Sequence, residues 1–140
     1  MKRIILDTNI IIAALMSQRG ASFKLLSLIG RGHFETVVSV PLVLEYETVA
    51  KRLSGTKIAL SLEMIDDVLD YLCKVSIHQT IYYLWRPVLK DPKDDHVLEV
   101  AMNAQTDVIV TFNVRDFSGA SQHDVEIIKP KEFLKQIGEL

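Results

Sequence analysis

The sequence predicts an α/β fold, in which a central parallel sheet of about five strands carries helices on both faces of one domain, residues 1–140. Short apolar runs rich in β-branched residues alternate along the chain with segments of helical apolar spacing. The runs are continuous, as expected of strands that are covered on both faces. Acidic residues follow several apolar segments, and ligands on such sheets bind beyond the carboxyl ends of the strands.

The N-terminal half contains two predicted strands and three predicted helices. In order, they are a strand at 4–6, helices at 10–16 and 23–29, a strand at 34–39 and a helix opened by Pro41. Gly30 and Gly32 are a stop signal for the second helix. The helix after Pro41 has an apolar stripe that we expect to include Leu42, Leu44, Val49 and Leu53.

The C-terminal half continues the alternation. The predicted elements are a helix at 61–75, a short strand at 76–78, a helix from Asp91 to about Ala104, strands at 108–111 and 126–128, and a helix at 130–137. Asp91 followed by Pro92 is the pattern of an N-cap and a first helical residue. The aromatic segment 82–85 is ambiguous, and we assign it to neither a helix nor a strand. The crossovers between parallel strands are expected to be right-handed.

Composition narrows the class of protein. About 49% of the residues are hydrophobic and 24% are charged, with a formal net charge of −2, which is typical of a soluble globular domain and argues against a generally basic nucleic-acid binder. The single Cys73 predicts a buried thiol in a reducing compartment. No segment approaches the roughly 20 apolar residues that a membrane span requires, so we expect a cytoplasmic protein without membrane contact.

Four acidic residues from separate segments are expected to meet at the carboxyl edge of the sheet: Asp7, Glu45, Asp94 and Asp116. Asp7 ends the first strand, and an N-cap is its simplest alternative role. Asp116 follows the strand at 108–111, where a turn-stabilising role is the alternative. Converging carboxylates repel one another, so their coincidence indicates a divalent metal.

Helical phase separates neighbouring candidates. Glu45 is three residues after Leu42 and four before Val49, so it shares their stripe, whereas Glu47 does not. Asp94 precedes the apolar positions of its own helix by three, four and seven residues, and Asp95 points about 100° away. We therefore favour Glu45 and Asp94, although a capping-box role for Asp94 and a ligand role for Asp95 both stay open.

Carboxylate oxygens suit Mg²⁺ or Mn²⁺, and no Cys or His spacing indicates zinc. A bound divalent ion acidifies water and stabilises charge on a leaving oxygen, so the expected reaction is phosphodiester hydrolysis. Thr111 or Asn113 is positioned to hold a metal-bound water. We count Asn113, Thr111, Asp95 and Asn9 as accessory residues. Lys90, Lys93 and Arg115 are candidates for phosphate contacts, with solvated surface as the alternative for each.

The motifs resemble those of PIN-domain proteins, in particular the VapC-like group that includes toxins of toxin–antitoxin pairs. The resemblance rests on five segments that span nearly the whole chain: Leu6-Asp7-Thr8-Asn9, 39–46, Asp91-Pro92-Lys93-Asp94, 111–117 and 128–133. It implies a PIN-like three-layer fold, with the family's acidic quartet at Asp7, Glu45, Asp94 and Asp116. It also implies Mg²⁺- or Mn²⁺-dependent ribonuclease activity on RNA, a homodimer and an antitoxin partner.

The leading hypothesis is therefore a metal-dependent endoribonuclease, as the candidate toxin of a toxin–antitoxin pair. The alternative is a catalytically weak PIN scaffold that acts as a dimeric protein- or RNA-binding module, which the amphipathic segment 61–75 and the aromatic segment 82–85 motivate. A nucleotide-binding protein of the doubly wound type is disfavoured, because no glycine-rich phosphate loop follows the first strand.

Overall fold

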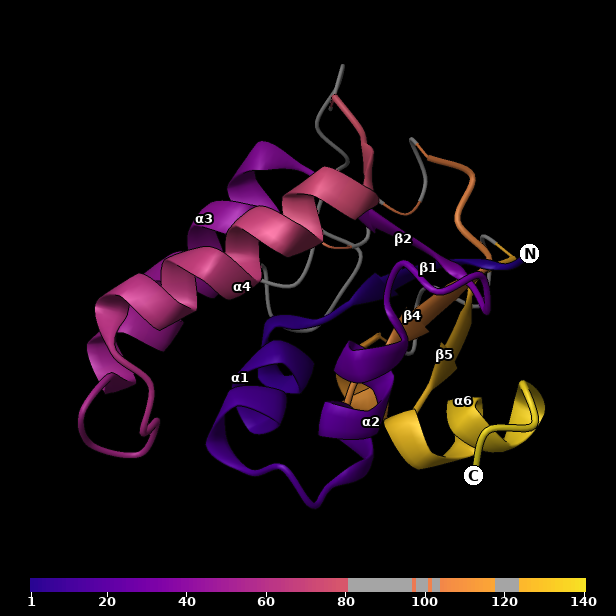
Figure 1. Ribbon diagram of the computed structural model, residues 1–140. Helices are drawn as coiled ribbons and strands as arrows, with labels where there is room; N and C mark the ends of the chain where they lie inside the picture. The colour runs from indigo at the N-terminus through magenta and orange to yellow at the C-terminus, as the bar shows by residue number, and fades with distance from the viewer. Residues whose placement is uncertain (81–96, 98–100, 102–103, 118–123) are drawn as a thin grey trace.

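The computed structural model describes residues 1–80, 97, 101, 104–117 and 124–140. Within this part of the chain, five parallel strands form one sheet in the order β3-β2-β1-β4-β5 (Figure 1). The strands are β1 (Arg3–Leu6), β2 (Glu35–Val38), β3 (Ile77–His78), β4 (Val108–Val110) and β5 (Glu126–Ile128). Four of the five lie within the segments where the sequence predicts strands, and β1 begins one residue before its predicted segment.

The chain order reverses between β1 and β4, the two neighbours at the centre of the sheet. Ile4 pairs with Val108, and Leu6 pairs with Val110. The backbone N–H of Asp7 then donates to the carbonyl of Val110 over 2.9 Å, which extends the pairing one residue past the strand. A parallel sheet leaves a crevice at the carboxyl ends of its strands where the order reverses. The fold therefore positions Asp7 at this crevice.

Five helices cover the described part of the sheet: α1 (Thr8–Met16), α2 (Ala21–Leu28), α3 (Val40–Leu53), α4 (Leu62–Val75) and α6 (Pro130–Gln136). Neighbouring helices contact one another in the order α6, α2, α1, α3, α4. Val97 and Ala101 are helical and buried, in agreement with the predicted helix at 91–104, whose other residues up to 103 lie outside the described ones. The architecture is that of a PIN-like three-layer α/β fold. No described helix combines the length and apolar character needed to span a membrane.

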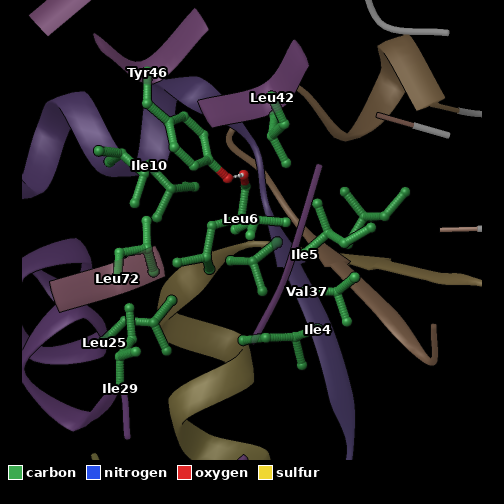
Figure 2. Packing of buried hydrophobic residues seen from close by; sticks show 14 of the residues in the cluster. Ile4, Ile5, Leu6, Ile10, Leu25, Ile29, Val37, Leu42, Tyr46 and Leu72 are labelled. Carbon is green, nitrogen blue, oxygen red and sulfur yellow. Dashed lines mark hydrogen bonds between the residues drawn. The ribbon is translucent and has the colours of Figure 1, made fainter. Parts of the chain in front are cut away.

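The core is built around β1. Ile4, Ile5 and Leu6 are almost completely buried, and residues of α1, α2 and α3 pack around them (Figure 2). Burial of each such side chain contributes about 1.5–3 kcal/mol to stability. Phe34 and Phe133 add an edge-to-face contact, with ring centroids 5.6 Å apart, that joins the entry of β2 to α6. The strand that precedes Asp7 is therefore firmly packed in the core.

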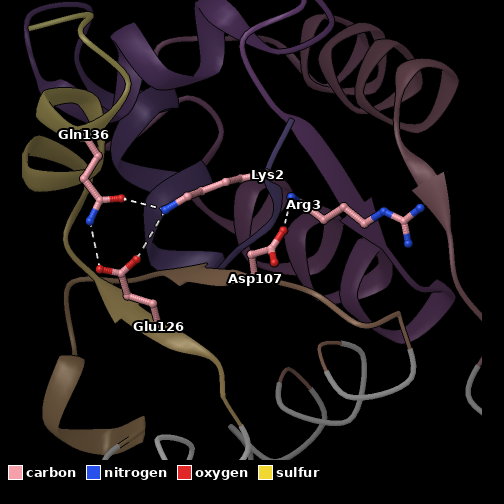
Figure 3. Close-up of polar contacts among 5 residues, drawn as sticks. All are labelled: Lys2, Arg3, Asp107, Glu126 and Gln136. Atoms are coloured by element: carbon pink, nitrogen blue, oxygen red, sulfur yellow. Dashed lines mark hydrogen bonds and ion pairs between the residues drawn. The ribbon is translucent and has the colours of Figure 1, made fainter.

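Polar contacts hold the opposite, amino edge of the sheet (Figure 3). Lys2 Nζ lies 3.8 Å from Glu126 Oε1 and donates to Gln136 Oε1 over 3.3 Å. The backbone N–H of Arg3 donates to Asp107 Oδ2 over 2.9 Å. These contacts join the starts of β1, β4 and β5 to one another and to α6. They are exposed, so each ion pair contributes only about 0–1 kcal/mol.

The helices occupy the predicted segments, although α1 and α2 each begin two residues earlier than predicted, and one predicted apolar stripe needs a correction. Gly30 adopts φ 79° directly after the C-cap of α2, as a glycine stop signal requires. The predicted stripe of α3 is wrong at Leu44, whose side chain is 54% exposed. The buried face instead follows Leu42, Tyr46 and Ala50 at intervals of four. Position 44 lies about 200° around the helix from position 42, which turns it away from the core.

Candidate functional site

A cavity of about 470 Å³ opens at the carboxyl ends of β1 and β4. Its walls come from Asp7 and one side of α1 along its length, from the middle of α3 and from the segment that follows β4. The lining residues are Asp7, Thr8, Asn9, Ile12, Ala13, Met16, Glu45, Val49, Phe112 and Asn113. One part of the wall carries carboxylate and amide groups, and the remainder is apolar.

Asp7 is the most deeply placed acidic group of this pocket, with 6% of its surface exposed. It is also the N-cap of α1, because its Oδ1 accepts from the backbone N–H of Thr8 over 2.9 Å. Oδ2 accepts from the hydroxyl of Thr111 over 2.7 Å. The N-terminus of a helix favours negative charge, so these contacts stabilise the buried carboxylate and fix its direction. Capping and pocket lining are thus compatible roles for one side chain.

Glu45 reaches the same pocket from α3. The hydroxyl of Ser39 caps this helix by accepting from the backbone N–H of Leu42 over 3.3 Å, and Glu45 lies half-buried in the second turn. The hydroxyl of Thr8 donates to Glu45 Oε2. Glu47, in contrast, does not line the pocket, and its carboxylate lies 3.3 Å from Lys51 Nζ. The two glutamates of α3 therefore occupy different environments.

The segment after β4 supplies the third side of the site. Thr111 is completely buried, and its hydroxyl both donates to Asp7 and accepts from the backbone N–H of Asn113 over 3.0 Å. Asn113 lines the pocket. Asp116 lies half-buried in a short helical turn at 114–117, where its N–H donates to the Asn113 carbonyl over 3.0 Å. Asp116 is close to the site in sequence, but it does not line the described pocket.

The remaining predicted residues are not placed. Asp94 and Asp95 lie outside the described residues, and so do Lys90 and Lys93. Among the residues that are described, no group of three or more His, Cys, Asp or Glu side chains is close enough to hold a metal ion. The structure thus brings together two of the four predicted carboxylates, Asp7 and Glu45.

The donors present in the pocket fit a divalent cation. Asn9 Oδ1 is buried and has no hydrogen-bond partner within the described part of the chain, although Asn9 lines the pocket beside both carboxylates. A buried amide oxygen without a donor is costly unless a cation or water occupies the space before it. Burial raises the pKa of Tyr46, and the negative charges of Asp7 and Glu45 raise it further. The site therefore combines hard oxygen donors with local negative charge, as Mg²⁺ or Mn²⁺ requires.

Sequence reasoning missed two contacts that shape the pocket. The Tyr46 hydroxyl donates to the carbonyl of Leu6, which ties α3 to the end of β1 (Figure 2). The hydroxyl of Thr8 ties α1 to Glu45. The spacing of four residues between Leu42 and Tyr46 was a sequence signal that Tyr46 occupies a core position. A tyrosine hydroxyl in the core needs a hydrogen-bond partner. Nothing local indicated which carbonyl it would reach.

Comparisons with known proteins agree with this architecture. A model of the PIN domain matches residues 3–115. Among solved structures, FitAB bound to the IR36 DNA fragment is similar at 24% identity and a TM-score of 0.63, covering 91% of this chain and 94% of that one. The crystal structure of FitAcB from Neisseria gonorrhoeae is similar at 22% identity and a TM-score of 0.60, covering 91% and 98%. No curated protein matches the chain.

Proposed function

Because this chain belongs to the PIN domain family, we propose that it is a nuclease, and specifically an endoribonuclease that requires Mg²⁺ or Mn²⁺ to hydrolyse RNA phosphodiester bonds. The observation that carries the proposal is the convergence of Asp7 and Glu45, from two different elements, in one pocket at the point where the strand order reverses.

Each residue of the pocket has a proposed role. Asp7 and Glu45 would hold the cation, and Asn9 and Asn113 would supply neutral oxygen donors beside it. When bound, the ion supplies an acidified water and stabilises negative charge at the reacting phosphate. Thr8 and Thr111 position the carboxylates through the hydrogen bonds described above. Outer hydrogen bonds of this kind tune metal affinity.

We propose that Asp94 and Asp116 complete the acidic set. Asp116 is three residues from Asn113, on the segment that the Thr111 hydroxyl anchors. Comparing Asp94→Asn with Asp95→Asn would decide which acid of that pair belongs to the site. Exposed Arg115 is a proposed contact for RNA phosphates.

The test uses the two glutamates of α3 as a matched pair. Purified Asp7→Asn and Glu45→Gln should cleave end-labelled RNA roughly 100-fold more slowly or worse in Mg²⁺ or Mn²⁺, because each removes a charge at the reacting centre. Glu47→Gln, with the same substitution outside the pocket, should cleave as the native chain does. Cleavage that persists in EDTA, or that is unchanged in both pocket variants, would contradict the proposal.

We also propose a biological setting: a toxin of a toxin–antitoxin pair that forms a homodimer and binds an antitoxin protein. The structure is similar to that of FitAB, which was solved bound to DNA, and this similarity motivates the two experiments that follow. Light scattering would measure the dimer. Co-purification with the product of an adjacent small gene, together with loss of RNA cleavage in the complex, would identify the antitoxin.

The alternative is a catalytically weak PIN scaffold that binds protein or RNA. Exposed apolar residues at the start of α4, Leu62 and Met64, favour a contact surface on this helix. Calorimetric titration with Mn²⁺ separates the two functions, since absence of binding at neutral pH would favour the scaffold.

A further inference from the structure

The candidate metal pocket has a second, apolar wall that the carboxylates do not explain. It consists of Ile12, Ala13, Met16, Val49 and Phe112. Phe112 is 44% exposed and Met16 is 47% exposed, so neither side chain is buried in the core. Within the described residues, Tyr71 on α4 is the other strongly exposed aromatic side chain, and it lies outside this pocket. An exposed aromatic ring beside a candidate reaction centre indicates a surface for a ligand.

Local structure holds the Phe112 backbone in place. Thr111 is completely buried and is tied to Asp7, while the N–H of Asn113 returns to the Thr111 hydroxyl over 3.0 Å. Val110 and Thr111 are buried, whereas the next residue, Phe112, is exposed. Phe112 and the following Asn113 both line the pocket. The contacts that orient Asp7 therefore also determine where Phe112 stands.

We propose that Phe112, which lines the same pocket as Met16, forms a subsite on which an unpaired nucleobase of the substrate stacks. The inference rests on the proposed nuclease function. Every nucleobase presents an apolar π-face that stacks on an aromatic ring. In an A-form duplex the bases are stacked inside the helix, so a base reaches the ring only from a single strand, a loop or a bulge.

The chemistry of the pocket matches a nucleotide in both of its parts. The carboxylate end would accept a phosphate if it held a divalent cation, and the apolar wall would accept the attached base. A cavity of about 470 Å³ is within the size range of small-ligand sites, about 300–1,000 Å³. The wall consists of aliphatic and aromatic side chains without charge, so it predicts stacking with weak preference among bases.

The test measures RNA binding separately from cleavage. In the Asp7→Asn background, which removes one carboxylate charge, binding of a short labelled single strand carrying 2-aminopurine would be measured by anisotropy and by quenching of the base. Adding Phe112→Ala should weaken binding about 5- to 150-fold and abolish the quenching, because base stacking on an aromatic ring is lost. Phe112→Trp should retain both signals. Tyr71→Ala, which removes an exposed aromatic ring elsewhere, should change neither.

Two outcomes would overturn the subsite. One is unchanged single-strand binding by Phe112→Ala. The other is full recovery of binding and quenching with Phe112→Leu, which would indicate a general apolar contact, such as a partner protein's side chain, in place of stacking. The proposed nuclease is tested independently: if Asp7→Asn and Glu45→Gln abolish cleavage while Phe112→Ala binds normally, the nuclease stands and the subsite fails. The converse result would retain the subsite and reject the metal nuclease.

Discussion

Replacing Thr111 with valine tests the contact on which the geometry of the site depends. The substitution keeps the β-branched shape of a completely buried residue and removes only its hydroxyl. That hydroxyl donates to Asp7 Oδ2 over 2.7 Å and accepts from the Asn113 N–H over 3.0 Å. Thr106 provides the matched control, because it is also buried and its hydroxyl has no partner among the described residues.

The difference between the two variants isolates the hydrogen bonds, because both exchange a buried hydroxyl for a methyl group. A hydrogen bond to a charged group contributes about 1.5–3 kcal/mol, so Thr111→Val should be about 2–3 kcal/mol less stable than Thr106→Val. The unfolding entropy is about 2.1 cal/mol/K per residue, or about 0.3 kcal/mol/K for 140 residues. The midpoints should therefore differ by roughly 7–10 °C.

Urea unfolding and thermal melts in EDTA would measure the stability of both variants without any contribution from bound metal. Thr111→Ser, which keeps the hydroxyl, should recover most of the lost stability and Thr106→Val should be neutral or stabilising. Equal stability of Thr111→Val and Thr106→Val would refute the reasoning, because the buried Asp7 carboxylate would then not depend on Thr111.

Two further predictions concern alkaline pH. Burial, followed by the charges of Asp7 and Glu45, raises the pKa of Tyr46 above its usual 10.0. Above that pH the unfolded chain loses the proton first, so native stability should fall by up to about 1.36 kcal/mol per pH unit, and Tyr46→Phe should remove this slope in urea unfolding. The hydrogen bond to Asp66 raises the pKa of Lys51 above its usual 10.5, and Glu47 makes a smaller contribution. The Lys51–Asp66 contact therefore stabilises the packing of α3 against α4 below pH 10.5. This stabilisation is lost as the pH rises through the pKa that Lys51 has in the folded chain. Asp66→Asn should lower stability slightly at pH 8 and converge on the native chain at high pH, whereas a persistent difference would contradict the assignment.

Local patterns predicted most of the elements. The β-branched run at 4–6 predicted the central strand, and Gly30 predicted the end of α2, because apolar periodicity and backbone conformational preference act over a few residues. The stripe of α3 was predicted less well. Leu44 was assigned to it although a position two residues after Leu42 lies about 200° around the helix, and Tyr46, four residues after Leu42, takes the buried position.

The candidate site was partly predictable. Asp7 and Asn113 could be placed at strand ends, and helical phase favoured Glu45 over Glu47, in line with their separate environments in the structure. The Thr8 to Glu45 contact was not foreseen, because it depends on how α1 and α3 approach each other. Asp94 and Asp116 stay predictions for the acidic set.

By itself, the sequence determined the alternation of strands and helices, the positions of the turns and the carboxylates that follow apolar segments, all of which depend on neighbours a few residues away. Tertiary structure alone decided that β4 pairs with β1. That pairing brings Thr111 to Asp7 across 104 residues of chain and exposes Phe112 at the rim of the same pocket. The physical reason is that strand pairing and side-chain packing join distant segments, and a local pattern records the ability of each segment to pair but not its partner.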